Sequence, residues 1–320
     1  MKQFTTSAKN FFILLFSYPE KKIFVDESYS FEKAKTIAGL FYAILVYYAL
    51  SYFTQWSYSP PIPVNFSPLW PVFWTHYVPF SNALNIMRVF FLTSVLFGAY
   101  FFRYRVARIF VFLAFLELFG FINSFGGITP NIYPVLYATF WLMFLPDAWD
   151  NPVSSEERKK FLFVFWGTQL FLLLTYTFSA VGKFYYAFVD FQMGRETILA
   201  PYALAYYIAH WLPRLQGASL LGPFFVRHQI VGWPFMLFTI YLQFFSFLIA
   251  FRPALHRLWA LGLTLFHIMS HLTLSLLFPE SVLMLLVFFY NSPFYRPNTT
   301  LREQLCALPL FGPVLRPLIM

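Results

Sequence analysis

Long hydrophobic runs separated by short polar segments dominate the pattern along this chain. A helix needs about 20 consecutive apolar residues to cross the hydrocarbon core of a bilayer. Runs near or below that length occur at residues 35–55, 87–103, 106–125, 131–146, 161–183, 229–251, 258–277 and 281–292. The pattern predicts an all-α, polytopic membrane bundle of about eight transmembrane helices. Because the runs at 131–146 and 281–292 are short, seven helices is the alternative.

The positions of the basic residues favour eight spans over seven. Cytoplasmic loops of membrane proteins carry an excess of Lys and Arg. With eight spans and a cytoplasmic N-terminus, all but five of the 22 Lys and Arg residues fall in segments predicted to be cytoplasmic, and both termini lie on that side. The exceptions are Arg88, Lys183, Arg195, Arg214 and Arg227.

Three regions follow from this topology. Residues 1–34 are predicted to form an amphipathic segment in the cytoplasm or at the membrane surface, residues 35–292 the transmembrane domain, and residues 293–320 a cytoplasmic tail. Two long connections on the non-cytoplasmic side, 56–85 and 184–228, are rich in aromatic residues. We expect them to close a cavity at the outer face of the bundle.

Composition supports the membrane class. Hydrophobic residues make up 59% of the 320 residues, aromatic residues 24% and charged residues only 11%, whereas an ordinary soluble domain has about 25% charged residues. The net charge of +9 comes from basic residues scattered at the ends of apolar runs. This distribution is typical of residues that set membrane topology, so we expect no nucleic-acid partner. The single cysteine, Cys306, excludes an intrachain disulfide and a cysteine metal cage.

Ionisable groups inside membrane spans are costly, so each is a candidate for function. Lys183 is the strongest. Ser179 lies four residues before it and Tyr176 seven, which places polar groups on the same helical face. A lysine in a dry, polar-lined site can act as a base. The alternative is a lysine that ends a helix at the interface and extends toward water.

Two histidines and a glutamate are the other candidates inside the spans. His267 and His271 lie one turn apart and have the spacing of metal ligands. However, Ile268 follows His267 where a zinc protease has Glu, so we favour a hydrogen-bonded packing pair, expect no metal, and leave a proton-handling role for His267 open. Glu117 fits a neutral core carboxyl, a partner of a basic residue or part of a proton path.

Four short motifs occur in the order found in a known family. They are Thr175 to Lys183 (TYTFSAVGK), Asp190 to Gly194 (DFQMG), His210 to Leu212 (HWL) and Phe266 to Met269 (FHIM). They resemble the lysine-bearing span, Asp-Trp-x-x-Gly, His-Trp-Leu and Phe-His-x-Met of the bacterial HTTM (horizontally transferred transmembrane) family and of vitamin K-dependent gamma-carboxylases. The resemblance covers about 175–290, and the N-terminal half agrees only in hydropathy.

The resemblance implies a site, a cofactor and a location. The matching lysine of the carboxylases is taken to deprotonate vitamin K hydroquinone, which implies Lys183 as base, His267 as a second catalytic residue, and reduced vitamin K or menaquinone as cofactor. It also implies a multi-pass protein of the bacterial inner membrane with its site on the non-cytoplasmic side. We expect the quinone or substrate to be bound by Tyr176, Ser179, His210, His271 and Glu117. Lys183, His267 and His210 are expected to converge in one cavity.

The chain also departs from the carboxylases. It has Asn131-Ile132 where they have an Asn-His pair, and Phe191 where they have Trp. Three functions therefore stay open: a quinone-using, carboxylase-like lyase or oxidoreductase; a partner-dependent maturation or export factor for a small secreted peptide; and a transporter or lipid-binding protein. The expected partners are a membrane lipid or quinone and a small peptide or protein. Internal repeats are not evident, which argues against a transporter.

Overall fold

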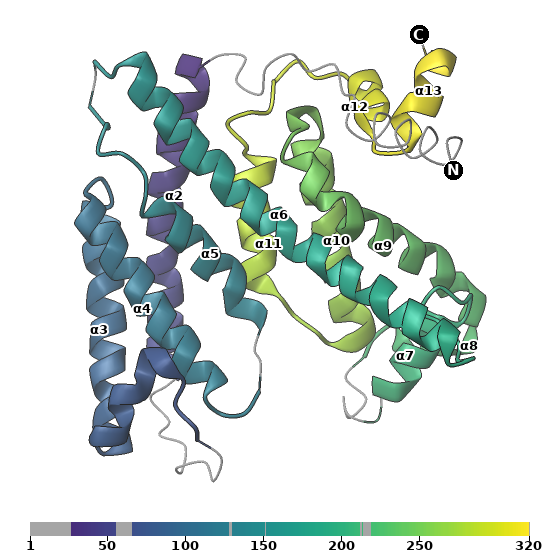
Figure 1. The fold of residues 1–320 in the computed structure, drawn as a ribbon, viewed down its shortest axis with the longest axis horizontal. Coiled ribbons are helices and arrows are strands. Elements are labelled where there is room, and N and C mark those ends of the chain that lie inside the picture. Colours follow the sequence, from purple (N-terminus) through teal and green to yellow (C-terminus); the bar gives the residue numbers. More distant parts are fainter. Residues whose placement is uncertain are drawn as a thin grey trace, which may run out of the picture. The chain divides into compact units, whose positions relative to one another are not determined.

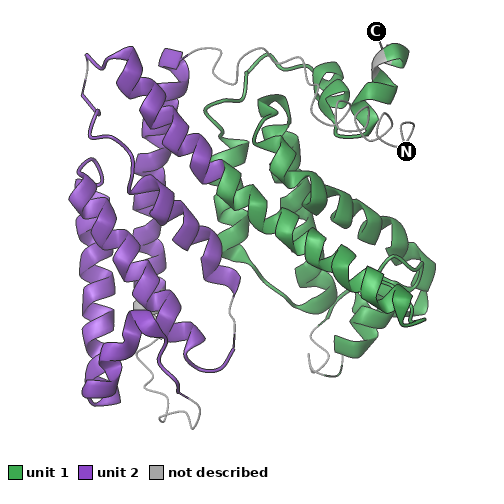
Figure 2. Cartoon of the chain, viewed as in Figure 1, with its two compact units in different colours: residues 1–25, 170–320 green, residues 26–169 purple. Residues whose placement is uncertain are grey.

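A computed structural model describes residues 27–55, 66–127, 130–150, 152–211, 213 and 219–319 of the chain, and these residues form helices without any strand (Figure 1). The described residues divide into two compact units (Figure 2): those from 170 onward belong to unit 1, and those up to 169 belong to unit 2. The boundary falls inside α6 (Ser155–Gln192), so one continuous helix contributes to both units. The predicted transmembrane domain, residues 35–292, therefore includes parts of both.

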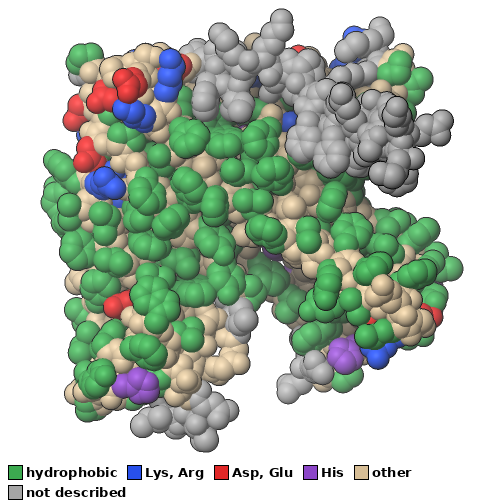
Figure 3. Space-filling view, viewed as in Figure 1, with side chains coloured by type: hydrophobic (Ala, Val, Ile, Leu, Met, Phe, Trp, Pro, Cys, Tyr) green, Lys and Arg blue, Asp and Glu red, His purple; other side chains and the backbone are tan. Residues whose placement is uncertain are grey.

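Five helices in the described part of the chain are long and apolar enough to cross a membrane. They span residues 27–51, 80–101, 105–123, 155–192 and 229–249, and each coincides with a predicted hydrophobic run. The other three predicted runs also coincide with helices, but these are shorter or less apolar. Hydrophobic side chains cover most of the visible surface in Figure 3. A multi-pass membrane protein fits this surface, because apolar side chains facing lipid carry no hydration cost.

Unit 2 is a helical bundle. Its helices are α2 (Glu27–Gln55), α3 (Phe80–Phe101), α4 (Arg105–Asn123), α5 (Tyr133–Leu142) and the start of α6, with 3₁₀ turns η1 (Trp70–Tyr77) and η2 (Pro130–Ile132). Neighbouring helices α2 and α3, α3 and α4, and α4 and α5 pack together. At Gly98 of α3 an added Cβ would collide with the side chain of Val111 of α4, so only glycine allows this close approach.

Several charged residues lie together at one end of unit 2. The fully buried guanidinium of Arg108 donates to Asp147 (3.0 Å) and to two main-chain carbonyls of the α3–α4 turn (2.7 and 2.9 Å). Lys35 donates to a carbonyl of the α5–α6 connection (3.1 Å), and Arg158 pairs with Glu27 (3.0 Å). The start of α2, the α3–α4 turn and the start of α6 therefore lie together, as expected for segments on one side of a membrane.

Unit 1 is built around the antiparallel helices α9 (Gly232–Ile249) and α10 (His256–Leu274). The other elements are the end of α6, α7 (Ala203–Trp211), α8 (Gly222–Arg227), η4 (Gln229–Val231), η5 (Pro253–Leu255), α11 (Pro279–Leu285), the π-helical η6 (Leu286–Tyr290), α12 (Leu301–Ala307) and α13 (Phe311–Ile319). The start of α10 meets the end of η6, where Arg257 Nε donates to Tyr290 O (3.1 Å). The α11–η6 segment therefore runs back along α10.

Two predicted boundaries differ from the structure. Helix α2 begins at Glu27, inside the predicted N-terminal segment 1–34, whose residues 1–26 lie outside the described residues. Helix α6 continues nine residues past Lys183, so this lysine does not end its helix. The reason is that the sequence has no Gly or Pro after Lys183 until Gly194, where a left-handed backbone (φ 66°) stops the helix.

The predicted connections and tail contain helices of their own. In the first aromatic connection, 56–85, the described part contains η1, and residues 56–65 lie outside the described residues. The second, 184–228, holds the end of α6 together with α7 and α8, which pack against α9 and α10. In the predicted tail, 293–320, helix α12 begins with a capping box made by Thr300 and Glu303.

Candidate functional site

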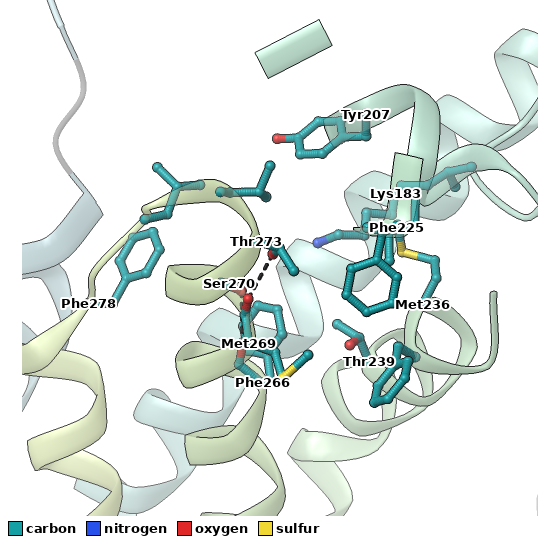
Figure 4. A pocket seen from close by; sticks show the side chains of 15 residues that line it. Lys183, Tyr207, Phe225, Met236, Thr239, Phe266, Met269, Ser270, Thr273 and Phe278 are labelled. Atoms are coloured by element: carbon teal, nitrogen blue, oxygen red, sulfur yellow. Dashed lines mark hydrogen bonds between the residues drawn. The ribbon is translucent and has the colours of Figure 1, made fainter. Parts of the chain in front are cut away.

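Unit 1 contains a cavity of about 380 Å³ next to Lys183 (Figure 4). Helices α6, α7, α8, α9 and α10 and the segment after α10 all contribute to its wall. Most of the lining is aromatic or aliphatic, and Lys183 is the only basic or acidic side chain among the described residues that line it. These residues are Lys183, Ile198, Leu204, Tyr207, Phe225, Phe235, Met236, Thr239, Phe266, Met269, Ser270, Thr273, Leu274, Leu276 and Phe278.

Two side chains hold the Lys183 amine at the cavity. Its Nζ donates to Ser179 Oγ (2.7 Å), one turn back on α6, and to Gln243 Oε1 (2.9 Å) on α9. A further oxygen, Ser179 O, is 3.4 Å away. An ammonium group has three N–H donors, so the two short bonds leave one donor weakly used. Figure 4 shows the amine directed toward Thr273 rather than away from the cavity.

Gln243 is itself fixed by a contact between α6 and α9. Its side chain is only 2% exposed. The main-chain N–H of Phe247, one turn after Gln243, donates to the Thr177 hydroxyl of α6 (2.9 Å). That hydroxyl in turn lies 3.3 Å from Gln243 O. Thr177 thus bonds to the backbone of α9 at the turn that carries Gln243.

His267 lies beside the cavity wall without lining the cavity. Its ring contacts Phe266 and Phe278 (centroids 4.9 and 5.4 Å apart), both of which line the cavity. His267 Nε2 is 2.8 Å from the Tyr176 hydroxyl, and the side chain is only 6% exposed. Its buried Nδ1 has no hydrogen-bond partner within the described part of the chain. The structure therefore brings His267 and Tyr176 together in a second layer behind the wall.

Hydroxyl groups give the cavity acceptors as well as a donor. Thr273 Oγ1 donates to Met269 O (2.7 Å) and Ser270 Oγ to Phe266 O (2.9 Å), both within α10. Because each hydroxyl donates its hydrogen to a backbone carbonyl, its oxygen lone pairs remain available to accept a hydrogen bond from a ligand. The site thus combines an amine donor and hydroxyl acceptors with an apolar wall, which suits a ligand with a large apolar body and a small polar head.

The remaining predicted site residues do not line this cavity. His210 is exposed because α7 turns Leu204, Ile208 and Trp211 toward its neighbours, and residue 210 lies on the opposite face. His271 is exposed in the last turn of α10. Glu117 is half-buried on α4 and belongs to unit 2. Of the three side chains expected to converge, Lys183 lines the cavity, His267 contacts its wall, and His210 does neither.

Several residues of the site were missed by the sequence reasoning, Gln243 and Thr177 above all. Gln243 could have been found from the sequence, because a glutamine in the middle of the apolar run 229–251 is as unusual as the ionisable residues named as candidates for function. Thr177 carried no such signal, since its neighbours Thr175 and Ser179 are equally polar. Among the residues described, no three His, Cys, Asp or Glu side chains group closely enough to hold a metal ion.

Comparison with protein-family models, with curated proteins and with solved structures finds no match to this chain. Because one fold can support many functions, the function of this chain depends on the chemistry of the site.

Proposed function

We propose that the chain is a membrane protein of eight spans, with the cavity beside Lys183 in the non-cytoplasmic half. The three helices that are shorter or less apolar support this count by where their ends lie. In unit 2, the segment that contains α5 follows the end of α4 and returns to its start, where Asp147 accepts from Arg108 and from the main-chain N–H of Arg105 (both 3.0 Å). The segment therefore extends along the whole length of α4, and it crosses the membrane if α4 does.

Helix α10 and the segment 275–290, which contains α11 and η6, support the count in the same way in unit 1. Helix α10 packs antiparallel to α9, and the segment 275–290 starts at the end of α10 and turns back along it past His267, which contacts Phe278. The segment ends at the start of α10, where His256 Nδ1 and Ser292 Oγ are 2.7 Å apart. Both segments therefore traverse the height of α9, which is itself long and apolar enough to span.

Orientation follows from the turn between α9 and α10. Arg252 of this turn donates to Ala307 O (2.7 Å), and Arg257 stacks on Tyr295 (4.2 Å to the ring centroid), so the turn and the C-terminal segment lie together. These basic residues favour the cytoplasmic side. The cavity residues of α9 and α10, from Phe235 to Thr239 and from Phe266 to Leu274, lie at the opposite ends of the two helices.

The cavity is proposed to bind a lipid-soluble ligand with a hydroxyl-bearing head, a reduced quinone of the vitamin K type. The observation that carries this proposal is the Lys183 amine, held by Ser179 and Gln243 at the wall of an otherwise apolar cavity. In its neutral form the amine accepts the hydroxyl proton of the head, while the aromatic wall takes the ring and prenyl chain. The reduced quinone supplies the reducing chemistry, in agreement with the carboxylase-like motifs around Lys183.

The test is to purify the protein in mild detergent and identify the lipids that remain bound by mass spectrometry. Wild type should retain a quinone in near-stoichiometric amount, and Lys183→Ala should lose most of it. Lys160→Ala is the matched control, because Lys160 is an exposed lysine of the same helix paired with Glu156 (2.7 Å). Absence of quinone from wild type would contradict the proposal and would favour the peptide-maturation alternative. Equal amounts of quinone in all three samples would show that quinone binding does not depend on Lys183.

A further inference from the structure

Helix α13 carries an apolar stripe on its outer face. Phe311, Val314 and Leu318 follow the spacing i, i+3, i+7, which places them on one side of a helix. Their side chains are 54%, 64% and 78% exposed. Soluble surfaces rarely present aligned apolar residues at such exposure without a partner that covers them.

The opposite side of α13 is already occupied. Gly312 approaches α12 so closely that an added Cβ would collide with the backbone of Cys306. The helix is also tied to α9, where the Tyr241 hydroxyl donates to Pro309 O (2.8 Å), and the Tyr241 ring covers part of Phe311, at the start of the stripe (centroids 5.4 Å apart). The α12–α13 pair is therefore held in a fixed orientation on unit 1, with the stripe facing outward.

We propose that α13 is an interfacial helix whose stripe of Phe311, Val314 and Leu318 inserts into the lipid surface on the side of the α9–α10 turn. The location supports lipid as the occupant. Arg252 bonds α12 directly to the end of α9, a helix long enough to span a membrane. A short amphipathic helix beside the end of a span lies where the headgroups meet the acyl chains.

Charge supports the same occupant. Residues 293–320 contain Arg296, Arg302 and Arg316 but only one acidic residue, Glu303, whose carboxylate accepts from the main-chain N–H of Thr300 (2.7 Å) in the capping box of α12. The segment is therefore basic, and basic segments beside a membrane span are attracted to anionic headgroups.

The test places a bimane fluorophore on single cysteines in the full chain, with Cys306 replaced by Ala. Val314→Cys and Leu318→Cys report on the stripe, and Asn298→Cys is an exposed polar control in the same C-terminal segment. Each variant is placed in nanodiscs of phosphatidylcholine and phosphatidylglycerol. Bromine on the lipid acyl chains quenches a label in the bilayer, and iodide in the buffer quenches a label in water.

We expect brominated lipid to quench the labels at 314 and 318 several-fold more than the label at 298, with the reverse order for iodide. Iodide quenching at 314 and 318 equal to that at 298 would overturn the proposal, because the stripe would then face water. Protection of 314 and 318 from both quenchers would also overturn it, because protein would then cover the stripe. All three positions are exposed, so the substitutions leave the packing intact.

Discussion

At the scale of single residues, the position of the Lys183 amine depends on Gln243. Replacing this glutamine by leucine removes a buried acceptor from an amine that has few others nearby. We expect Gln243→Leu to lower the free energy of unfolding by about 1–2 kcal/mol, measured by SDS titration in mixed micelles. Gln243→Glu keeps an acceptor and should recover most of the loss. Gln229→Leu, at an exposed glutamine, is the control, and an equal loss there would contradict the assignment.

The Tyr176–His267 pair is suited to a double-mutant cycle. The two side chains lie 2.8 Å apart on α6 and α10, and both ring nitrogens of His267 would lack a described partner once the Tyr176 hydroxyl is removed. We expect Tyr176→Phe to cost about 1 kcal/mol of unfolding free energy. The coupling with His267→Phe should be of similar size. Additive effects, within error of the unfolding curves, would show that the hydrogen bond contributes nothing.

Residues differ in how far the sequence reveals their contacts. The Ser179–Lys183 bond was predictable, because residues four apart on a helix face each other whatever surrounds them. The Gln243–Lys183 bond was not, because it depends on where α6 and α9 meet. His210 shows a related limit. Its motif suggested a role at the site, but the rotation of α7 about its own axis is set by the apolar contacts of Ile208 and its neighbours.

At the scale of elements, the α6–α9 contact depends on one threonine. Thr177 bonds to the backbone of α9, whereas Thr175, two residues earlier, donates to Leu172 O of its own helix (2.7 Å). We expect Thr177→Val to cost about 1 kcal/mol more unfolding free energy than Thr175→Val, in the same SDS titration. The two substitutions are alike in volume and helix propensity, so equal costs would show that the interhelical bond is not a source of stability.

The α3–α4 contact depends on a glycine. Gly98→Ala would push a methyl group into Val111, while Gly182→Ala on α6 meets no atom within 4 Å. We expect Gly98→Ala to destabilise the protein by about 1–3 kcal/mol. Gly182→Ala should be neutral or stabilising by up to about 1 kcal/mol, because alanine favours helix. Thermal unfolding in detergent compares the two. A Gly98→Ala variant as stable as Gly182→Ala would mean that α3 and α4 are not closely packed.

Helices were easier to predict than their ends. Each of the eight hydrophobic runs coincides with a helix, because a long apolar segment in lipid must satisfy its own backbone hydrogen bonds. The end of α6 was missed because its last nine residues, from Phe184 to Gln192, are rich in aromatic side chains and look like a connection by hydropathy. Only the left-handed Gly194 marks the true end.

At the scale of the whole molecule, the proposed eight-span topology predicts which residues label from each side. In the Cys306→Ala background, Asp150→Cys and Asn298→Cys should react with a membrane-impermeant maleimide from one face, and His76→Cys and Leu277→Cys from the other. All four positions are exposed. Intact and inverted vesicles make the comparison. Labelling of Leu277→Cys from the same face as Asn298→Cys would show that α10 and α11–η6 do not cross.

The distribution of charge carried more information about the whole molecule than any motif did. Basic residues expected on one side, such as Lys35, Arg108 and Arg158, do lie at one end of unit 2. The division into two units was not predictable. It depends on which helices touch, and the boundary at residue 169 falls inside a continuous helix where neither hydropathy nor composition changes.

The length of α6 has a consequence for the depth of Lys183. The helix has 38 residues, and Lys183 lies 28 residues after its start, which is about 42 Å along the axis. The hydrocarbon core of a bilayer is only about 30 Å thick. The first turns of the helix carry charged residues from Glu156 to Lys160, so the core begins near Phe161, and an upright helix carries Lys183 about 33 Å further, to the opposite boundary. The thickness of the bilayer therefore sets the depth of Lys183, and longer or shorter acyl chains should change the access of lipid-soluble molecules to the amine.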